Sequence, residues 1–242
     1  MRIHLVNPNT TQSMTDGIAA AARAAALPGT TINATQPAMG PASIEGYYDE
    51  AFAVPGMLAR IAEHHEADAH VIACFDDTGL DAARSLATAP VIGIGEAAFH
   101  AASLLAGRFS VITTLGRSIP AIEHNLIRYG LASRCAKVRA AEIPVLELDN
   151  PASDASARIS AEIAAAITHD RAEAIVLGCA GMAALAARLS QLHGLPVVDG
   201  VAAAVAFAEA LVRLGLRTSK RGGYAAPLAK PYAGSFAAFA PL

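Results

Sequence analysis

Short apolar runs alternate along the chain with longer stretches in which apolar residues recur at helical spacing. The short runs are rich in β-branched residues, which is typical of strands buried on both faces of a parallel sheet. The predicted strands are residues 2–6, 31–34, 70–73, 91–94, 109–113, 137–143, 174–177 and 196–198. The predicted helices are residues 11–26, 47–65, 79–87, 96–106, 118–129, 153–169, 183–192 and 201–214. This alternation predicts an α/β fold built on mainly parallel sheets.

An internal repeat divides the chain into two halves. Three pairs of segments resemble each other at a spacing of 105 or 106 residues: 2–7 with 108–113, 69–74 with 173–179, and 90–94 with 196–200. A repeat of this length indicates two duplicated lobes followed by a C-terminal tail, because the units of solenoid proteins are shorter.

Composition narrows the class of protein. The 242 residues are 54% hydrophobic and 16% charged, with a net charge of -3, so no basic face is available for nucleic acid or for an anionic membrane surface. No apolar run is long enough for a membrane-spanning helix, and the N-terminus lacks the features of a signal peptide. Three cysteines without close pairing do not form a disulfide framework. We expect a cytoplasmic protein.

The repeat pairs Cys74 with Cys179, each directly after a buried strand and before a helix. Open α/β sheets bind their ligands at this edge, where helix N-termini supply free N–H groups and a positive dipole. If the two lobes face each other, one thiol lies on each side of a single cleft. Two opposed acid/base groups are what racemisation of a carbon acid requires. The alternatives are that the cysteines are small buried side chains of the core, or that they form a redox pair. The CxxC spacing of a redox pair is absent, and Cys135 is the cysteine that has no partner in the repeat.

Five segments around these positions resemble the hydantoin racemases of the aspartate/glutamate racemase superfamily, whose allantoin racemases are close relatives. They are residues 6–10 (VNPNT), 41–46 (PASIEG), 71–77 (VIACFDD), 109–114 (FSVITT) and 177–182 (LGCAGM). The resemblance implies two pseudo-symmetric lobes with the active site between them, two catalytic thiols, no cofactor and a homo-oligomer. It also implies that the last helix crosses back to the first lobe, which gives lobes of 1–95 plus 201–242 and of 96–200.

Departures from related families bear on the substrate. The amino-acid racemases that the chain resembles carry Asp-Ser after the first strand and Cys-Thr-His at the second thiol, where this sequence has Asn7-Pro8 and Cys179-Ala180. The groups that would handle an α-ammonium are therefore missing. Arylmalonate decarboxylases, which the chain also resembles, keep one of the two cysteines. An amino-acid racemase, a decarboxylase and a non-catalytic two-lobed binding protein remain alternatives.

A hydantoin ring, that of allantoin included, suits these residues, because its C5–H lies beside a carbonyl and ionises to an enolate-like anion. We expect backbone N–H groups near Ser43, Phe75, Thr113 and Ala180 to stabilise that anion. The predicted substrate-binding residues are Asn7, Ser43, Ile44, Phe75, Asp76, Thr113, Thr114, Ala180 and Gly181. For the threonines, helix capping is the equal alternative. Asp77 is expected to cap the helix that starts near Gly79.

Two other signals carry less weight. Residues 93–98 (GIGEAA) match the dinucleotide fingerprint after a strand, but no acidic residue ends the next strand. The histidines show no metal-ligand spacing, so no metal site is predicted. The sequence leaves the C5 substituent open, as it does the thiol that serves each enantiomer.

Overall fold

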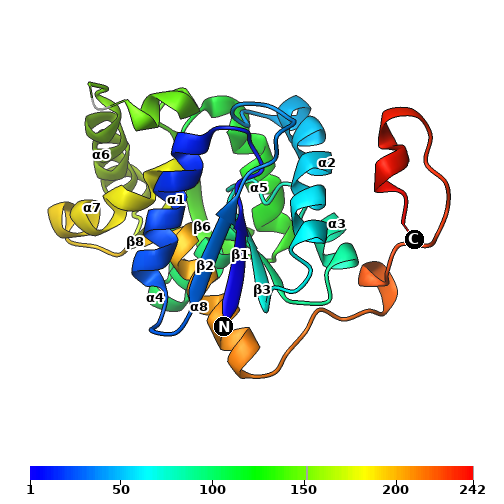
Figure 1. The fold of residues 1–242 in the computed structure, drawn as a ribbon. Coiled ribbons are helices and arrows are strands. Elements are labelled where there is room, and N and C mark those ends of the chain that lie inside the picture. Colours follow the sequence, from blue (N-terminus) through cyan, green and yellow to red (C-terminus); the bar gives the residue numbers. More distant parts are fainter. Residues whose placement is uncertain (151, 242) are drawn as a thin grey trace.

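The computed structural model describes residues 1–150 and 152–241, and its strands form two four-stranded parallel sheets (Figure 1). The first sheet has the order β2-β1-β3-β4, with bounds Thr31–Thr35, Arg2–Val6, Ala69–Ile72 and Val91–Gly93. The second has the order β6-β5-β7-β8, with bounds Cys135–Ala140, Phe109–Thr113, Ala174–Gly178 and Val197–Asp199. The strand order is the same in both sheets, so the predicted α/β class with two pseudo-symmetric halves is confirmed.

Within the described residues there are eight α-helices, of which seven connect successive strands and the eighth follows the last strand. They are α1 (Gln12–Ala25), α2 (Tyr47–Glu63), α3 (Leu80–Leu86), α4 (Ile94–Leu105), α5 (Ile119–Arg128), α6 (Ala155–Ala165), α7 (Ala186–His193) and α8 (Gly200–Arg213). Short helical turns include η1 (Gly116–Ser118), η2 (Ala132–Arg134), η3 (Val145–Asp149), η4 (Ala166–Asp170), η5 (Ala180–Leu185), η6 (Gly222–Tyr224) and η7 (Gly234–Phe239).

Three apolar clusters hold the layers together. Helices α2 and α3 cover the outer face of the first sheet, and α6 and α7 cover that of the second. The largest cluster lies between the sheets and joins both of them through α1, α4, α5 and α8. Here the two halves exchange helices: α4 follows the first sheet but packs on β7, while α8 follows the second sheet and packs on β3. The lobe boundaries given above stay a proposal.

Several predicted bounds differ from the structure. The strand expected at 137–143 is β6, Cys135–Ala140, because the apolar residues after Ala140 continue as a loop in which Ala141 and Ile143 donate to the carbonyls of Thr113 and Thr114. The helix expected at 153–169 changes from α-helix to a π-helical turn at Ala166. No helix in residues 1–150 and 152–241 is long and apolar enough to cross a membrane.

Candidate active site

A cavity lies where the central strands β1, β3, β5 and β7 end, and it holds about 430 Å³ of empty space when the open solvent at its mouth is counted. The loops after these four strands all reach it, as expected for the carboxyl edge of parallel sheets. Its lining consists of Asn7, Pro8, Asn9, Met14, Ile44, Ala73, Cys74, Phe75, Asp76, Thr113, Thr114, Ser118, Val145, Gly178, Cys179 and Ala180. Both repeated thiols therefore face one cavity.

Most of the residues predicted for the site line this cavity, and two do not. Ser43 and Gly181 are absent from the lining, although each is the chain neighbour of a lining residue. The lining residues that the prediction missed are Pro8, Asn9, Met14, Ala73, Ser118, Val145 and Gly178. Those directly beside a predicted residue line the cavity because they are its neighbours in the chain. Met14, Ser118 and Val145 come from helical turns, and no sequence signal marks them.

The Cys74 thiol is half-buried and has polar neighbours from its own loop. The hydroxyl of Thr78 donates to its sulfur at 3.2 Å, and the backbone N–H of Asp76 also donates to it. Burial nevertheless raises the pKa of Cys74 well above its usual range, and the nearby carboxyls of Asp76 and Glu50 raise it further. At neutral pH Cys74 therefore rests as a protonated thiol.

A pair of carboxyls lies beside this thiol. Burial, followed by the charges of Glu50 and Asp77, raises the pKa of Asp76 to about 7. Burial and the neighbouring Asp49 raise the pKa of Glu50 as well. The Oε1 atom of Glu50 is buried and has no hydrogen-bond partner within the part of the chain that the structure describes. Sequence reasoning missed Glu50, because an acidic residue in the first turn of a helix is usually explained by the helix dipole.

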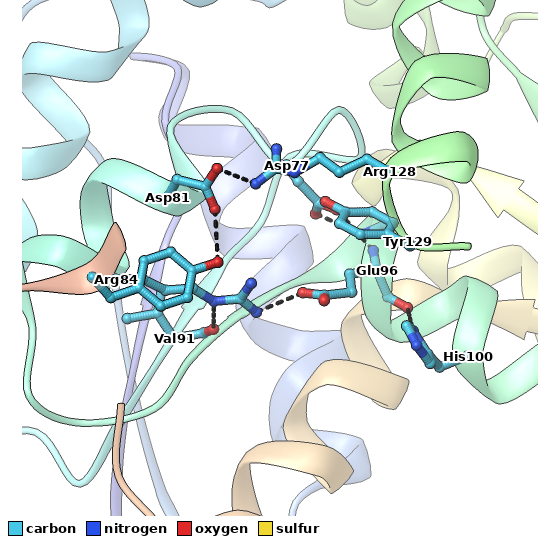
Figure 2. Close-up of polar contacts among 10 residues, drawn as sticks. Asp77, Asp81, Arg84, Val91, Glu96, His100, Arg128 and Tyr129 are labelled. Carbon is cyan, nitrogen blue, oxygen red and sulfur yellow. Dashed lines mark hydrogen bonds and ion pairs between the residues drawn. The ribbon is translucent and has the colours of Figure 1, made fainter. Parts of the chain in front are cut away.

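Asp77 caps a different helix from the one predicted. The start of α3 has no side-chain cap. Asp77 instead accepts hydrogen bonds from the backbone N–H groups of Gly95 at 2.9 Å and Glu96 at 2.8 Å, at the start of α4, and from the hydroxyl of Tyr129 at 2.7 Å (Figure 2). The prediction failed because α4, 18 residues further along the chain, offers free N–H groups directly in front of the loop.

This arrangement also explains the dinucleotide-like glycines. A Cβ atom at Gly93 would lie 2.1 Å from Oδ1 of Asp77, and one at Gly95 would lie 2.2 Å from the carbonyl oxygen of Phe75. The glycines let the loop of Cys74 approach the start of α4, and a carboxylate of the protein occupies the place where a phosphate would bind.

The loop of Cys74 is also fixed from α5. The side-chain amide of Asn125 donates to the carbonyl oxygen of Asp76 at 2.8 Å, beside the Tyr129 contact. Phe75 is buried, lines the cavity and packs edge-to-face on Phe99 at 5.3 Å, so it serves both as core and as cavity wall. Residues from the second half of the chain thus hold the thiol loop of the first half.

The Cys179 thiol lies at the start of a helical turn in the second half of the chain. Cys179 directly precedes η5, whose first backbone bond runs from the N–H of Met182 to the carbonyl of Cys179 at 3.1 Å. The N–H groups of Ala180 and Gly181 therefore have no partner within that turn. The Thr113 hydroxyl donates to the carbonyl of Gly178 at 3.2 Å and caps no helix.

Asn7 is almost fully buried, and its amide is engaged by the protein. Its nitrogen donates to Oδ1 of Asn9 at 2.8 Å and to the Thr15 hydroxyl at 3.0 Å, and its oxygen accepts from the Asn9 N–H. Asn7 therefore shapes the loop after β1, and a direct contact with substrate stays a prediction.

Among residues 1–150 and 152–241, no three His, Cys, Asp or Glu side chains are grouped to hold a metal ion.

Comparison with known proteins places this geometry among racemases. The family model described as Asp/Glu/Hydantoin racemase matches residues 3–208. A protein named hydantoin racemase from Rhizobium meliloti is 51% identical over 97% of this chain and 98% of its own length. An allantoin racemase structure from Klebsiella pneumoniae is 48% identical, covers 100% of both chains and has a TM-score of 0.97. An allantoin racemase structure from Pseudomonas fluorescens is 44% identical, covers 97% of this chain and 100% of its own, and has a TM-score of 0.93.

Proposed function

The chain belongs to the Asp/Glu/hydantoin racemase family, and we propose that it racemises 5-substituted hydantoins, allantoin among them, by exchanging the proton at C5. The observation that carries the proposal is that Cys74 and Cys179, equivalent residues of the two repeated sheets, line the same cavity. Relatives named hydantoin racemase and allantoin racemase support the choice of ring.

The proposed reaction needs one proton acceptor and one proton donor on opposite faces of the ring. The Cys179 thiolate removes the C5 proton, and the electron pair of the C–H bond moves into the adjacent carbonyl. The Cys74 thiol then gives its proton to the opposite face of C5, which re-forms the C–H bond with inverted configuration. Cys74 is left as the thiolate and Cys179 as the thiol, so the protein is ready for the other enantiomer.

Donors and acceptors around the ring complete the proposed site. The N–H groups of Ala180 and Gly181 at the start of η5 are suited to the developing enolate oxygen. Asp76 and Glu50 are suited to accept hydrogen bonds from N–H groups of the ring or its substituent. We keep Asn7, Ser43, Ile44, Phe75, Thr113 and Thr114 as proposed substrate contacts. A cytoplasmic homo-oligomer that needs no cofactor also remains our expectation.

The test follows single enantiomers of allantoin and of 5-benzylhydantoin in D2O by optical rotation and by NMR. Loss of rotation together with deuterium at C5 is the expected result, and the relative rates identify the preferred substituent. A preparation in which both Cys74 and Cys179 are replaced by Ser measures spontaneous racemisation. Unchanged rotation over that background, across several hydantoins, would contradict the proposal.

A further inference from the structure

The chain beyond α8 first runs along α3 and is fastened there. The Thr218 hydroxyl donates to the carbonyl of Ala89 at 2.7 Å, and Nζ of Lys220 donates to the carbonyl of Arg84 at 2.6 Å. The Tyr224 hydroxyl donates to Asp81 at 3.0 Å. Residues up to Tyr224 therefore belong to the body of the molecule.

Residues 225–241, which we call the C-terminal arm, behave differently. The red end of the chain stands apart from the body in Figure 1. Among the arm's described residues, only the first is hydrogen-bonded to the body, through the N–H of Ala225 and the carbonyl of Gly222 at 3.1 Å. The side chains of Leu228 and Phe236 are 80% and 52% exposed, and Tyr232 is exposed as well. Phe236 contacts Phe239 within the arm, with 6.1 Å between ring centroids. An apolar segment of this kind in water has a strong tendency to find a surface to cover.

The body exposes a second apolar patch at the start of α2, which we call the α2 patch. It consists of Met39, Tyr47, Tyr48 and Phe52, of which Tyr48 is 77% exposed. The rings of Tyr48 and Phe52 lie 4.9 Å apart. Helix α2 packs on α3, the helix to which the base of the arm is fastened, so the arm and the α2 patch lie on the same side of the molecule (Figure 1).

We infer that the C-terminal arm covers the α2 patch of a second copy of this chain, and that the second arm covers the first patch in return. A twofold interface uses one face of the chain for both halves of the contact, and the arm and the patch share such a face. Charge supports the pairing, because Lys230 is the one charged residue in the arm, whereas Glu45 and Asp49 flank the patch. The solved Klebsiella pneumoniae structure matches this chain over its whole length, arm included.

The pairing has a consequence for the site. Helix α2 begins three residues after Ile44, which lines the cavity, and Glu50 on its first turns raises the pKa of Cys74. A partner's arm at this place would lie beside the cavity and limit the access of water. The inference deepens the expected homo-oligomer but does not depend on the proposed reaction, since its test needs no substrate.

Sedimentation equilibrium of the full chain is the first measurement, compared with the full-length variant Leu228→Ser/Phe236→Ser and with a chain that ends at Tyr224. We expect a mass of at least two copies for the unchanged chain and a smaller mass for both variants. A single-copy mass for the unchanged chain, or an unchanged mass in both variants, would overturn the inference. Circular dichroism checks that the variants remain folded.

The acceptor surface is tested by a fluorescent reporter, since the chain contains no tryptophan. Phe52→Trp should show blue-shifted emission in the full chain, and a red shift when the chain ends at Tyr224. Emission that does not depend on the arm would exclude the α2 patch. The matched control is Leu104→Ser/Leu105→Ser, which alters exposed leucines on α4 and should leave the mass unchanged. The variant Tyr48→Ser/Phe52→Ser alters the α2 patch itself. If the α4 variant dissociates and this variant does not, the interface lies on α4 instead.

Discussion

The first turns of α4 and α8 occupy equivalent places in the two halves but are capped in different ways. Asp199 precedes α8, and its carboxylate accepts from the N–H groups of Val201 at 2.9 Å and Ala202 at 3.0 Å. The equivalent residue before α4 is Gly93, which has no side chain. There the carboxylate comes from Asp77, in the loop of the first thiol.

The two loops that carry the thiols differ in the opposite sense, because here the carboxylate is present in the first half and absent from the second. The residue equivalent to Asp77 in the loop of Cys179 is Met182, which is buried in the outer core of the second sheet. Helix α8 is therefore capped by the residue that directly precedes it, whereas α4 is capped by the first thiol loop and holds that loop in place. The two halves share one backbone arrangement, but only the loop of Cys74 is held to a helix start by a carboxylate of its own.

The largest expected effect separates the two thiols. We expect Cys74→Ser and Cys179→Ser each to lower the rate of racemisation by at least ~10²–10⁴, the usual contribution of a positioned acid/base group. The fold should persist, because both side chains face the cavity. Each variant retains one base, so C5 deuterium exchange in D2O should survive for one enantiomer only, and for opposite enantiomers in the two variants.

Optical rotation and NMR of separate enantiomers measure both properties. Racemisation at an undiminished rate in either variant would contradict the two-thiol mechanism. Exchange of the same enantiomer in both variants would mean that the two cysteines do not act on opposite faces.

The next effect concerns the connection between the first thiol loop and α4. Asp77→Ala removes a helix cap, at about 1 kcal/mol, and leaves the half-buried Tyr129 hydroxyl without its partner, at about 1–3 kcal/mol. Asp77 also has a positive φ of 51°, which alanine tolerates poorly. We expect a loss of about 2–4 kcal/mol in chemical denaturation, and slower proton transfer at Cys74 than at Cys179.

A double variant that gives α4 the same kind of cap as α8 separates the effect of Asp77 on stability from its effect on the position of Cys74. Asp77→Gly combined with Gly93→Asp places the capping carboxylate before α4, as Asp199 is placed before α8. Stability should recover relative to Asp77→Gly alone, while transfer at Cys74 should stay slow because its loop is no longer held. Full recovery of both would show that Asp77 serves only the helix.

Much of the fold follows from local pattern. Parallel strands such as β4 and β7 are continuous apolar runs, and the repeat indicates which strands correspond. The predicted ends of elements were wrong where apolar residues continue beyond the end of the strand, as they do after Ala140. Hydrophobicity indicates which residues are buried, but it does not indicate which backbone groups are hydrogen-bonded in a sheet.

The thiols of the site were predictable for the same reason, since each follows a strand end that the repeat identifies. The partners of Asp77 and the orientation of Glu50 were not. Both depend on side chains brought together by the packing of α2, α4 and α5, and periodicity carries no information about such contacts. An acidic residue near a helix start has several possible caps within reach, and only the tertiary fold selects one.

A smaller effect distinguishes the thiols by pH. Folding raises the pKa of Asp76 from its ordinary value of 3.8 to about 7, so the folded state binds a proton between about pH 4 and 7 that the unfolded state does not. Stability therefore increases as pH falls through 7, and Asp76→Asn should reduce this slope in thermal melts at pH 5 to 8. Part of the slope should remain, because the pKa of Asp77 is also raised to about 7.

The same substitution removes a negative charge beside Cys74 and lowers the pKa of that thiol. The pH–rate profile should therefore shift to lower pH for the enantiomer whose proton Cys74 removes, and should change little for the other. Equal shifts for both enantiomers would show that Asp76 influences the two thiols alike.

The smallest effect is expected from the self-contained cap of α8. Asp199→Ala leaves the N–H groups of Val201 and Ala202 without their carboxylate, so we expect a loss of about 1 kcal/mol in chemical denaturation. Because Asp199 lies outside the cavity lining and its carboxylate accepts from the start of α8, rates for both enantiomers should stay close to those of the unchanged protein. Asp77→Ala is the matched comparison, with its larger loss and its one-sided kinetic defect. A comparable one-sided defect in Asp199→Ala would mean that α8 positions the second thiol after all, and that the two halves differ less than their caps indicate.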